Sequence, residues 1–538
     1  MAGYDYVIVG GGSAGSVVAS RLAAAQPSAA VLLIEAGSDG RGVAQIVDPP
    51  QWTKLDGTAL DWGYRYTPGA PVAGRSVPVP RGRVLGGCSA TNAMQWFRGH
   101  ADDYDAWERA GAAGWNYAAL LPYFRRSEAW EGGPSAQRGG DGPMRVTRPR
   151  DPHPVASAMV EGAAELGLAK LDDPNSGDTE GATLANLNIA EGRRFSVVDG
   201  YLPHWAPPPA PGQVPVGAWT SPPPPPPNLT VLTGSPAVRL GFGSGPDGPR
   251  CDSVHHLVRG TLRRTRASAG VILALGTFGT PELLVRSGIG DPAALRALGL
   301  PVTAALPGVG RNLQDHPLLM GMNFRARRRL GLPRDNGGGA LMNWRSSRAS
   351  RPDLHAFVVQ GRHAYPDAAA RYRLGGDPSV FAISPGLMGS VSKGCLTVRD
   401  ATRTGPDAVE IDSGFLTERA DVDALVEAMD TISELAATAA YAGLIDQPLM
   451  PPGRLSRADK EAFVRQNIAT FNHPCGTAAM GTGPDAVVDP GLRVIGVDGL
   501  RVVDASVIPV IPTGNTQAAV IAVAERAADL ITSGLISG

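Results

Sequence analysis

Cysteine is scarce in this chain of 538 residues, and the four that occur are Cys88, Cys251, Cys395 and Cys475. They lie far apart in the sequence and form no C-x-x-C pair, which argues against a disulfide framework and against a zinc site. We therefore expect no metal, and a reducing cytoplasm is the compartment that fits this composition.

No charge of one sign predominates either. The chain carries 49 basic and 50 acidic residues, which gives a formal net charge of −1, and it contains no long run of like charge. Nucleic acids and anionic membrane surfaces select proteins that have a basic face. The composition therefore argues against both kinds of partner.

Long apolar runs are absent as well. No stretch reaches the roughly 18 apolar residues that a membrane helix needs, so we expect no membrane span. The opening residues, MAGYDYVIVGGG, lack the charged and apolar regions of a signal peptide. The hydrophobic fraction of 43% is that of a globular protein, and 538 residues are too many for one ordinary domain. We expect two domains.

What the chain does contain, at its N-terminus, is a predicted strand, a glycine-rich turn and a predicted helix. The run from Tyr6 to Val9 is typical of a buried parallel strand. Gly10, Gly12 and Gly15 follow it in the order G-x-G-x-x-G. The first glycine permits a tight turn, the second lets a pyrophosphate approach the backbone, and the third lets the helix pack against the strand.

A second strand-like segment, AVLLIEAG, contains Glu35, about 20 residues after the last glycine, where a ribose-binding carboxylate belongs. Strand, glycines, helix and acid together predict a Rossmann-like α/β domain that binds an adenine dinucleotide. The motif alone does not distinguish FAD from NAD.

Other segments fit the same fold. RGRVLGGCSATNAMQWFRG contains the pair Gly86-Gly87, and such a loop can lay backbone N–H groups along a phosphate or a flavin edge. NLTVLTGSPAVRL is strand-like, as is the start of AGVILALGTFGTPELLVRSGIG. In the latter we expect a helix to begin at Thr280-Pro281, because proline is favourable at a helix start.

Residues 203–227 are rich in proline and include six prolines in a row. This composition excludes a regular helix and a central strand, so we expect an extended surface insertion of polyproline character. Residues 312–467 show alternating patterns, as in HAFVVQGRHAY and GCLTVRD, and one amphipathic helix, RADVDALVEAMDTISELAATAA. We expect the substrate-binding sheet there. His316, His355 and His363 have no acid or thiolate at metal-ligand spacing and are interpreted as structural or surface residues.

Near the C-terminus, FNHPCGTAAMG places His473 beside a proline in a stretch of small residues. This stretch alone does not tell whether His473 packs, binds a metal or moves a proton. Further on, a strand is predicted to end at Asp504-Ala505, and a helix over residues 517–531 is predicted to follow Asn515-Thr516. A helix N-terminus beside a polar loop suits an anionic or electron-rich ligand.

Over nearly its whole length the chain resembles the glucose–methanol–choline (GMC) oxidoreductase family, in particular choline-oxidase-like and hydroxymethylfurfural-oxidase-like members. The resemblance rests on VIVGGGSAGSVVASRL…EAG, RGRVLGG, GTFGTPELLVRSGIG, PGVGRNLQDH, HPCGTAAMG and GLRVVDASVIP…NTQ. Members of this family are FAD-dependent alcohol oxidases and dehydrogenases. The resemblance therefore implies FAD rather than NAD.

The resemblance also implies roles for single residues. In addition to Gly10 and Gly15, the residues that it places around FAD are Gly12, Ser13, Ala14, Glu35, Arg83, Leu85, Gly87, Asn92, Ala93, Val238, Asp504, Ala505 and Thr516. His473 matches the catalytic histidine, and Asn515 matches its partner. Cys88 replaces the commoner Ser or Gly. Thr91 stands where choline oxidases have a flavin-linking histidine, so FAD is expected to be noncovalent.

The resemblance further implies two interleaved domains. The FAD-binding domain would comprise residues 1–152, 228–311 and 468–538, and a substrate domain built on an antiparallel sheet flanked by helices would comprise residues 153–227 and 312–467.

The implied reaction oxidises a primary or small aromatic alcohol to the aldehyde. His473, with an ordinary pKa of about 6.5, would accept the hydroxyl proton while a hydride passes to flavin N5. Asn515 would donate a hydrogen bond to the forming alkoxide. O2 or another acceptor would take up the electrons, and no motif indicates which one, nor which alcohol or which oligomeric state.

Two alternatives stay open. One is a lyase that binds FAD and cleaves hydroxynitriles; such relatives favour a second histidine, so Asn515 argues against it. The other is a non-catalytic protein that binds flavin, or a partner through the proline-rich insertion, and the His473–Asn515 pair argues against it.

Overall fold

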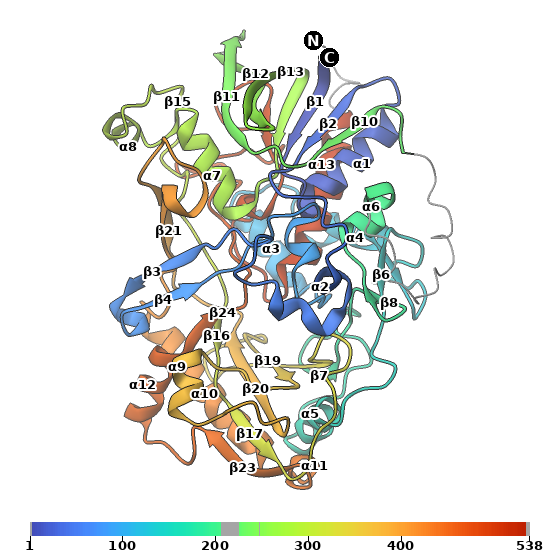
Figure 1. Ribbon diagram of the computed structural model, residues 1–538, viewed down its shortest axis with the longest axis vertical. Coiled ribbons are helices and arrows are strands. Elements are labelled where there is room, and N and C mark those ends of the chain that lie inside the picture. Colours follow the sequence, from blue (N-terminus) through green and yellow to red (C-terminus); the bar gives the residue numbers. More distant parts are fainter. Residues whose placement is uncertain (1–2, 206–224, 247, 534–538) are drawn as a thin grey trace.

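The computed structural model describes residues 3–205, 225–246 and 248–533 (Figure 1). The helices are α1 (Ser13–Ala25), α2 (Ala44–Val47), α3 (Ala101–Arg109), α4 (Tyr117–Ser127), α5 (Pro154–Glu165), α6 (Val197–Tyr201), α7 (Gly276–Arg286), α8 (Pro292–Ala297), α9 (Pro366–Arg371), α10 (Arg419–Ala436), α11 (Ala439–Ala442), α12 (Arg457–Asn467) and α13 (Thr516–Ser533). The strands are β1 (Tyr4–Val9), β2 (Val31–Ile34), β3 (Arg65–Gly69), β4 (Arg75–Pro78), β5 (Glu128–Trp130), β6 (Met144–Val146), β7 (Gly181–Leu184), β8 (Ile189–Ala190), β9 (Arg193–Arg194), β10 (Leu229–Leu232), β11 (Ala237–Ser244), β12 (Pro249–Val258), β13 (Thr261–Leu273), β14 (Ile289–Gly290), β15 (Ala304–Ala305), β16 (Pro317–Leu319), β17 (Asn323–Ala326), β18 (Ala340–Trp344), β19 (Leu354–Val359), β20 (Val380–Leu387), β21 (Cys395–Val398), β22 (Val409–Asp412), β23 (Ile445–Met450), β24 (Ile468–Thr470) and β25 (Leu500–Val502).

One sheet contains the N-terminal strand and has the order β10-β2-β1-β13-β12-β11, with β25 also paired to β13. The pairings β10-β2, β2-β1, β1-β13 and β13-β25 are parallel. The apolar segment 31–34 is buried at every position, as expected for a parallel strand covered on both faces. Helix α1 packs on this sheet and against α13, and α13 also packs against α4.

Strand β13 is 13 residues long, and its two halves pair with different neighbours. Its first half pairs antiparallel with β12, and most of its residues are exposed. Its second half pairs parallel with β1, and its last four residues are buried. The strand thus leads from an exposed antiparallel extension into the core.

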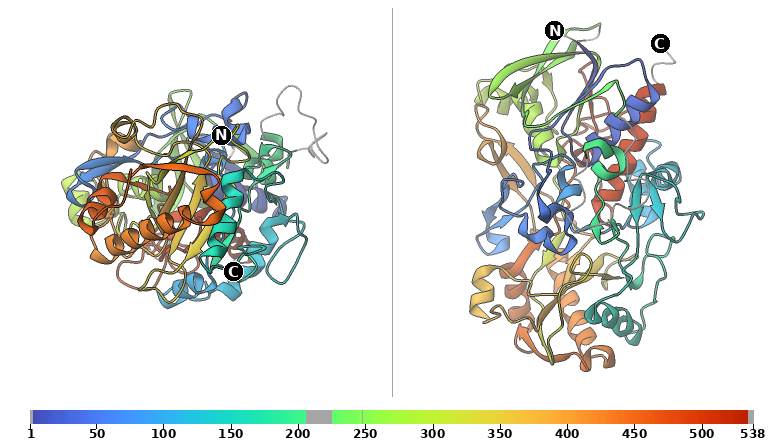
Figure 2. Two further views of the ribbon diagram at one scale, coloured as in Figure 1. Left: turned by 90° about the horizontal axis from the view of Figure 1, so that it is seen from below. Right: turned by 45° about the vertical axis from the view of Figure 1, so that its right-hand side comes forward.

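A second sheet has the order β23-β17-β20-β19-β18-β7, and β16 joins it by pairing with β20 and β24. All of its pairings are antiparallel. Helices α5 and α10 pack on it, and β20 is buried at every residue because it lies in the middle of the sheet. The two sheets lie toward opposite ends of the molecule, and β1 and the last turns of α13 lie at the end of the parallel sheet (Figures 1 and 2).

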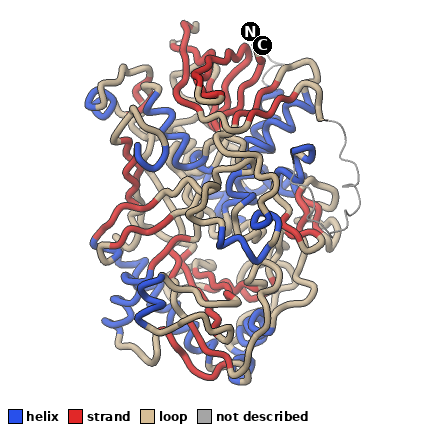
Figure 3. Tube along the Cα trace, in the orientation of Figure 1, coloured by secondary structure: helices blue, strands red, loops and turns tan. Residues whose placement is uncertain are grey.

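The predicted fold class, α/β with a Rossmann-like parallel sheet and a helix-flanked antiparallel sheet, is confirmed. Between the sheets the chain runs mainly as loops (Figure 3). The domain boundaries given above stay a prediction. The proline-rich insertion lies largely outside the described residues, because only its ends, 203–205 and 225–227, are among them. Within the described residues, no helix is both long and apolar enough to cross a membrane.

Helix α7 differs from its prediction. It begins at Gly276 and not at Thr280, so Pro281 lies inside it. A proline in a helix leaves the carbonyl four residues earlier without its usual N–H donor. Here that carbonyl belongs to Thr277, and the hydroxyl of Thr477 donates to it instead. A contact from a residue 200 positions away therefore makes the internal proline tolerable.

Candidate active site

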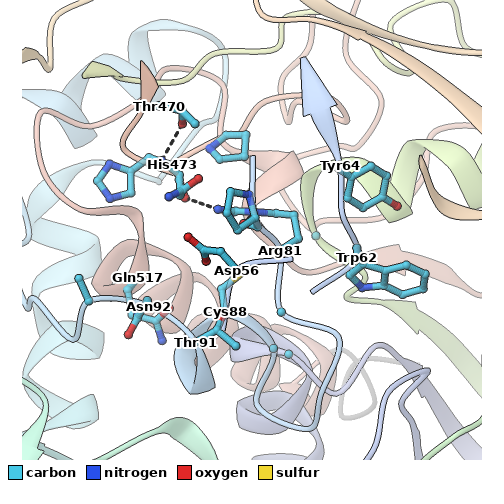
Figure 4. A pocket seen from close by; sticks show the side chains of 18 of the residues that line it. Asp56, Trp62, Tyr64, Arg81, Cys88, Thr91, Asn92, Thr470, His473 and Gln517 are labelled. Atoms are coloured by element: carbon cyan, nitrogen blue, oxygen red, sulfur yellow. Dashed lines mark hydrogen bonds between the residues drawn. The ribbon is translucent and has the colours of Figure 1, made fainter. Parts of the chain in front are cut away.

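A cavity of about 770 Å³ lies between the parallel sheet and the second sheet. Its lining includes Gly10, Gly12, Ser13, Ala14, Glu35, Arg83, Gly87, Asn92, Ala93, His473, Asp504, Ala505, Asn515 and Thr516. Figure 4 shows side chains from distant segments converging on it, among them Arg81, Thr91 and His473. Three residues that the sequence assigned to FAD do not line it, namely Gly15, Leu85 and Val238.

The absence of Gly15 from the lining has a steric reason. A Cβ atom at this position would overlap the carbonyl oxygen of Gly10, so Gly15 serves the close packing of α1 on the strand. Gly10 itself has φ +106°, and a Cβ there would overlap the carbonyl of Ala274, the residue after the neighbouring strand β13. These two positions require glycine, as the motif predicted.

Helix α1 offers the cavity an uncapped N-terminus. Gly12 is the N-cap residue and no side chain caps the helix, so the first N–H groups have no helical acceptor. Gly87 approaches Gly12 closely, since a Cβ at Gly87 would lie 2.8 Å from the Cα of Gly12. Two glycine loops therefore meet beside free donors and the positive end of a helix dipole, which suits a pyrophosphate.

Two buried carboxylates hold the backbone around this site. Glu35 accepts from the N–H groups of Gly11 (2.9 Å) and Gly37 (2.7 Å). Asp504 accepts from the N–H of Gly276 (2.9 Å) and from the hydroxyl of Thr280 (2.6 Å). Burial raises the pKa of Glu35 to about 7. Both side chains fix the loop geometry in addition to facing the cavity.

Leu85 and Val238, the other two assigned residues that do not line the cavity, lie close behind its wall. A Cβ at Gly11 would lie 2.9 Å from Cδ1 of Leu85, so Leu85 packs behind the first glycine loop. Ala237 lines the cavity and its neighbour Val238 does not. Roles for Leu85 and Val238 in binding FAD stay a prediction.

His473 lies in a tightly fixed loop after β24. Asn472 has φ 63°, a left-handed conformation that asparagine tolerates, and it reverses the chain. The carboxylate of Asp315 accepts from the N–H of His473 (2.9 Å), from the N–H of His316 (2.8 Å) and from the hydroxyls of Tyr66 and Thr470. One buried acid thus ties the two histidine backbones together.

Both ring nitrogens of His473 have polar neighbours. Nε2 lies 3.2 Å from Nδ2 of Asn515, and Nδ1 lies 2.9 Å from Nδ1 of His316. The side chain of Asn515 and the ring of His473 both face the cavity. Burial, and next to it the electrostatic effects of His316 and Arg81, hold the pKa of His473 well below its ordinary value. His473 is therefore a neutral imidazole, the form that can accept a proton.

Sequence reasoning did not find several residues that line the cavity. Three of them are Trp62, Tyr64 and Arg81. Others form a row of aromatic rings that extends from His473 along one wall of the cavity. Phe471 stacks on His473 with ring centroids 5.7 Å apart, Phe357 lies 5.6 Å from Phe471, and His363 lies 5.9 Å from Phe357. Phe471 is the first residue of the FNHPCGTAAMG stretch, whereas Phe357 and His363 carry no motif.

Of the three central histidines interpreted as structural or surface residues, only His363 lines the cavity. His316 is buried against His473, and His355 lies behind Phe471. Among the described residues, no three His, Cys, Asp or Glu side chains cluster so as to hold a metal ion.

Two sequence models of the GMC oxidoreductase family match the chain, the N-terminal model over residues 4–206 and 217–318 and the C-terminal model over residues 390–524. The chain belongs to the GMC oxidoreductase family. Human mitochondrial choline dehydrogenase is 34% identical to it, over 98% of this chain and 89% of the human protein. The oxygen-dependent choline dehydrogenase of Brucella ovis is 32% identical, over 98% of this chain and 95% of that protein.

The fold of this GMC oxidoreductase also matches solved structures. The crystal structure of pyridoxine 4-oxidase from Mesorbium loti superposes with a TM-score of 0.88 and 33% identity, over 98% of both chains. The protein is an enzyme of the FAD-dependent oxidoreductases, as the sequence resemblance implied. Three features of the cavity fit this cofactor. They are the free N–H groups at the start of α1, the close approach of Gly87 to Gly12, and the cavity volume of about 770 Å³.

The purified protein is expected to be yellow, and precipitation with acid should release the flavin into the supernatant. The reason is that Thr91, which lines the cavity, offers no ring nitrogen for the histidyl link of choline oxidases. Absorbance of the supernatant and of the resuspended pellet measures the outcome. Flavin that stays on the pellet would contradict noncovalent binding.

Glu35→Ala is expected to weaken FAD binding while the fold stays largely intact. A hydrogen bond to a charged group contributes about 1.5–3 kcal/mol, which corresponds to roughly 10- to 100-fold in affinity. Titration of the apoprotein with FAD measures the loss. Asp39→Ala is the matched control, because Asp39 is a partly exposed acid in the same loop that does not line the cavity. Equal affinities of both variants would remove Glu35 from the FAD site.

Proposed function

We propose that this protein oxidises a primary alcohol, preferably a small aromatic one, to the aldehyde, with His473 as the base and Asn515 as a hydrogen-bond donor to the substrate oxygen. The observation that carries the proposal is the convergence of His473 Nε2 and Asn515 Nδ2, 3.2 Å apart, at the wall of the cavity that also contains the glycine loops. An alcohol oxygen within reach of both atoms would meet one acceptor and one donor.

The two side chains divide the work on the hydroxyl group. When bound, FAD supplies the acceptor for the hydride that leaves the carbinol carbon. His473 takes the hydroxyl proton at Nε2, which it can do because its depressed pKa keeps the imidazole neutral. The amide of Asn515, aimed beforehand at the same point, stabilises the negative charge that develops on the oxygen. Asn515 cannot accept the proton itself at neutral pH.

The aromatic row supports an aromatic substrate. Phe357, Phe471 and two imidazoles form one wall of the cavity with neighbouring centroids 5.6–5.9 Å apart. Aromatic pairs at such distances favour offset or edge-to-face packing and contribute about 0.5–1.5 kcal/mol beyond their buried area. A flat ring with a hydroxymethyl group at His473 would fit along this wall.

The charges near His473 disfavour a quaternary ammonium substrate, although the relatives named above are choline dehydrogenases. The groups that act on His473 electrostatically are His316, Arg81 and His355, and none of them is an acid. Of the cavity acids, Glu35 and Asp504 hold backbone N–H groups, and Glu282 lies 3.4 Å from Arg286. For Asp56, burial and the neighbouring Asp61 raise the pKa to about 7, which disfavours its charged form.

The intact His473–Asn515 pair also argues against the other two readings. A hydroxynitrile lyase of this family favours a second histidine where Asn515 stands, and a non-catalytic binding protein needs no aligned base and donor.

We propose further that the electrons pass on to O2 or another acceptor. A reducing, cytoplasmic location is supported by the four cysteines, all of which are unpaired.

Anaerobic mixing of the holoenzyme with a panel of alcohols tests the proposal. Benzyl alcohol and its ring-substituted analogues should bleach the flavin absorbance faster than choline or ethanol at equal concentration. Repeating the assay with O2 and with an artificial dye identifies the acceptor. If choline reduced the flavin faster than every aromatic alcohol, the proposed substrate class would be wrong; if no alcohol reduced it, the proposed reaction would be wrong.

The pH dependence of kcat/KM is expected to show an acid limb below about 6.5, the ordinary pKa of histidine. The neutral imidazole is the active form, so activity is lost as pH falls through the pKa of His473, which lies well below that value. The sequence alone had placed this titration near the ordinary value, because burial is not visible in it. Steady-state rates with one alcohol from pH 4 to 8 measure the limb, and a midpoint at or above 6.5 would contradict a depressed pKa.

A further inference from the structure

The pair of imidazoles formed by His316 and His473 has no role in the reaction described so far. The two Nδ1 atoms lie 2.9 Å apart, and the rings meet edge to face with centroids 5.2 Å apart. His316 is completely buried and does not line the cavity. It therefore cannot touch the substrate, and its contact with the reaction runs through His473.

The hydrogen-bond geometry assigns the protons. In the orientation that the structure gives Asn515, its amide nitrogen faces Nε2 of His473 and donates to it, so Nε2 carries no proton. A neutral imidazole has one proton, which then sits on Nδ1 of His473 and is donated to Nδ1 of His316. The proton of His316 is then on Nε2, a buried nitrogen without a hydrogen-bond partner among the described residues, and the carbonyls of Pro512 and Met388 act on this ring electrostatically.

We propose that His316 is a positioning residue that fixes His473 in the tautomer with its proton on Nδ1, so that the Nε2 lone pair faces the cavity. This inference rests on the proposed function, since it assigns Nε2 as the atom that takes the alcohol proton. After that transfer His473 is an imidazolium, and its Nδ1–H still donates to a neutral acceptor. Asp315 adds to the orientation, because it accepts from the backbone N–H of both histidines.

A neutral acceptor at this place has a consequence for the base. A carboxylate near Nδ1 would stabilise the imidazolium and raise the pKa of His473. Here the side chains that face the pair are His355 from β19, Arg81 from the loop after β4, and Asn515 from the loop before α13. Asp315 is the acid beside the pair, and its four hydrogen bonds come from two backbone N–H groups and two hydroxyls, so none comes from a ring nitrogen of His316 or His473. Burial lowers the pKa of His316 to about 3, so it stays a neutral acceptor through the working range.

Substitutions of His316 test the proposal in the holoenzyme. His316→Asn keeps an acceptor oxygen in place of Nδ1 and should reduce flavin at nearly the wild-type rate. His316→Phe removes the acceptor and should be roughly 10- to 100-fold slower with its FAD content unchanged, the range for one lost hydrogen bond to a charged group. His316→Asp supplies a charged acceptor and should move the acid limb of flavin reduction up by about one to three pH units. Stopped-flow reduction by one alcohol across pH gives all three results.

His355→Phe is the matched control. His355 is equally buried and lies 5.6 Å from Phe471 by ring centroids, but its Nδ1 is paired with Asn343 at 2.7 Å and not with His473. This variant should keep the wild-type acid limb, because burial lowers the pKa of His355 to about 3 and the ring is neutral above that pH. If His355→Phe and His316→Phe lost the same activity, or if His316→Asp kept the wild-type limb, His316 would be only a packing residue.

A direct measurement covers the case in which the variants do not fold. In holoenzyme labelled with ¹⁵N-histidine, the signals of His473 are those that are lost in His473→Ala. At neutral pH they should show a protonated Nδ1 and an unprotonated Nε2. The reverse tautomer would overturn the proposal. Because this spectrum needs no substrate, it is independent of the alcohol panel, and failure of the proposed function is told apart from failure of this inference.

Discussion

His473→Ala is expected to bind FAD like the wild type and to slow flavin reduction by an alcohol at least 100-fold, within the roughly 10²–10⁴-fold range of general base catalysis. The loss follows because, among the residues that the structure describes, no other neutral acceptor lies at this point of the cavity wall. His316 is buried behind His473, and Asn515 cannot take up a proton at neutral pH. Stopped-flow anaerobic reduction measures the rate, and the flavin spectrum of the purified variant measures the FAD content.

Two further observations separate a lost base from a damaged fold. Imidazole added to His473→Ala should restore part of the rate, because the deleted ring leaves a space bounded by Phe471 and His316. The acid limb of the wild-type pH profile should be absent from the residual rate of the variant. Rapid reduction of His473→Ala by the same alcohol, without imidazole, would make His473 a packed loop residue.

The sequence predicted the parts of this protein that depend on local patterns. The turn at Gly10, the packing of Gly15 and the fold class follow from spacing and residue type. The glycines lie in one short segment, where residue type decides the backbone conformation, and strand periodicity indicates which segments form the sheets.

The sequence predicted less of what depends on distant contacts. The hydrogen bond between His473 and Asp315 joins residues 158 positions apart, and the contact of His473 with His316 spans 157. No local sequence pattern predicts contacts between residues so far apart. His316 was therefore interpreted as a structural or surface residue, and the pKa of His473 was taken as ordinary. The start of α7 was misplaced for the same reason, since the hydroxyl that compensates for Pro281 comes from Thr477.

Asn515→Ala is expected to slow flavin reduction less than His473→Ala does. Removing one donor aimed at a developing negative charge costs about 2.7–4 kcal/mol, or 10²–10³ in rate. The base remains in this variant, and so does the contact between His473 Nδ1 and His316. The fold should be preserved, because the amide oxygen of Asn515 has no hydrogen-bond partner within the described residues.

Asn515→His is the sharper test, because it supplies a donor of a different kind. An imidazole at this position can donate to the alkoxide, so the variant should stay active, but it can also titrate. A second pH-dependent step in flavin reduction is therefore expected, absent from the wild type and from Asn515→Ala. Comparison of the three proteins from pH 4 to 8 decides between a donor and a scaffold. If Asn515→Ala reduced flavin as fast as the wild type, Asn515 would serve only the start of α13, and the reaction would rest on His473 alone.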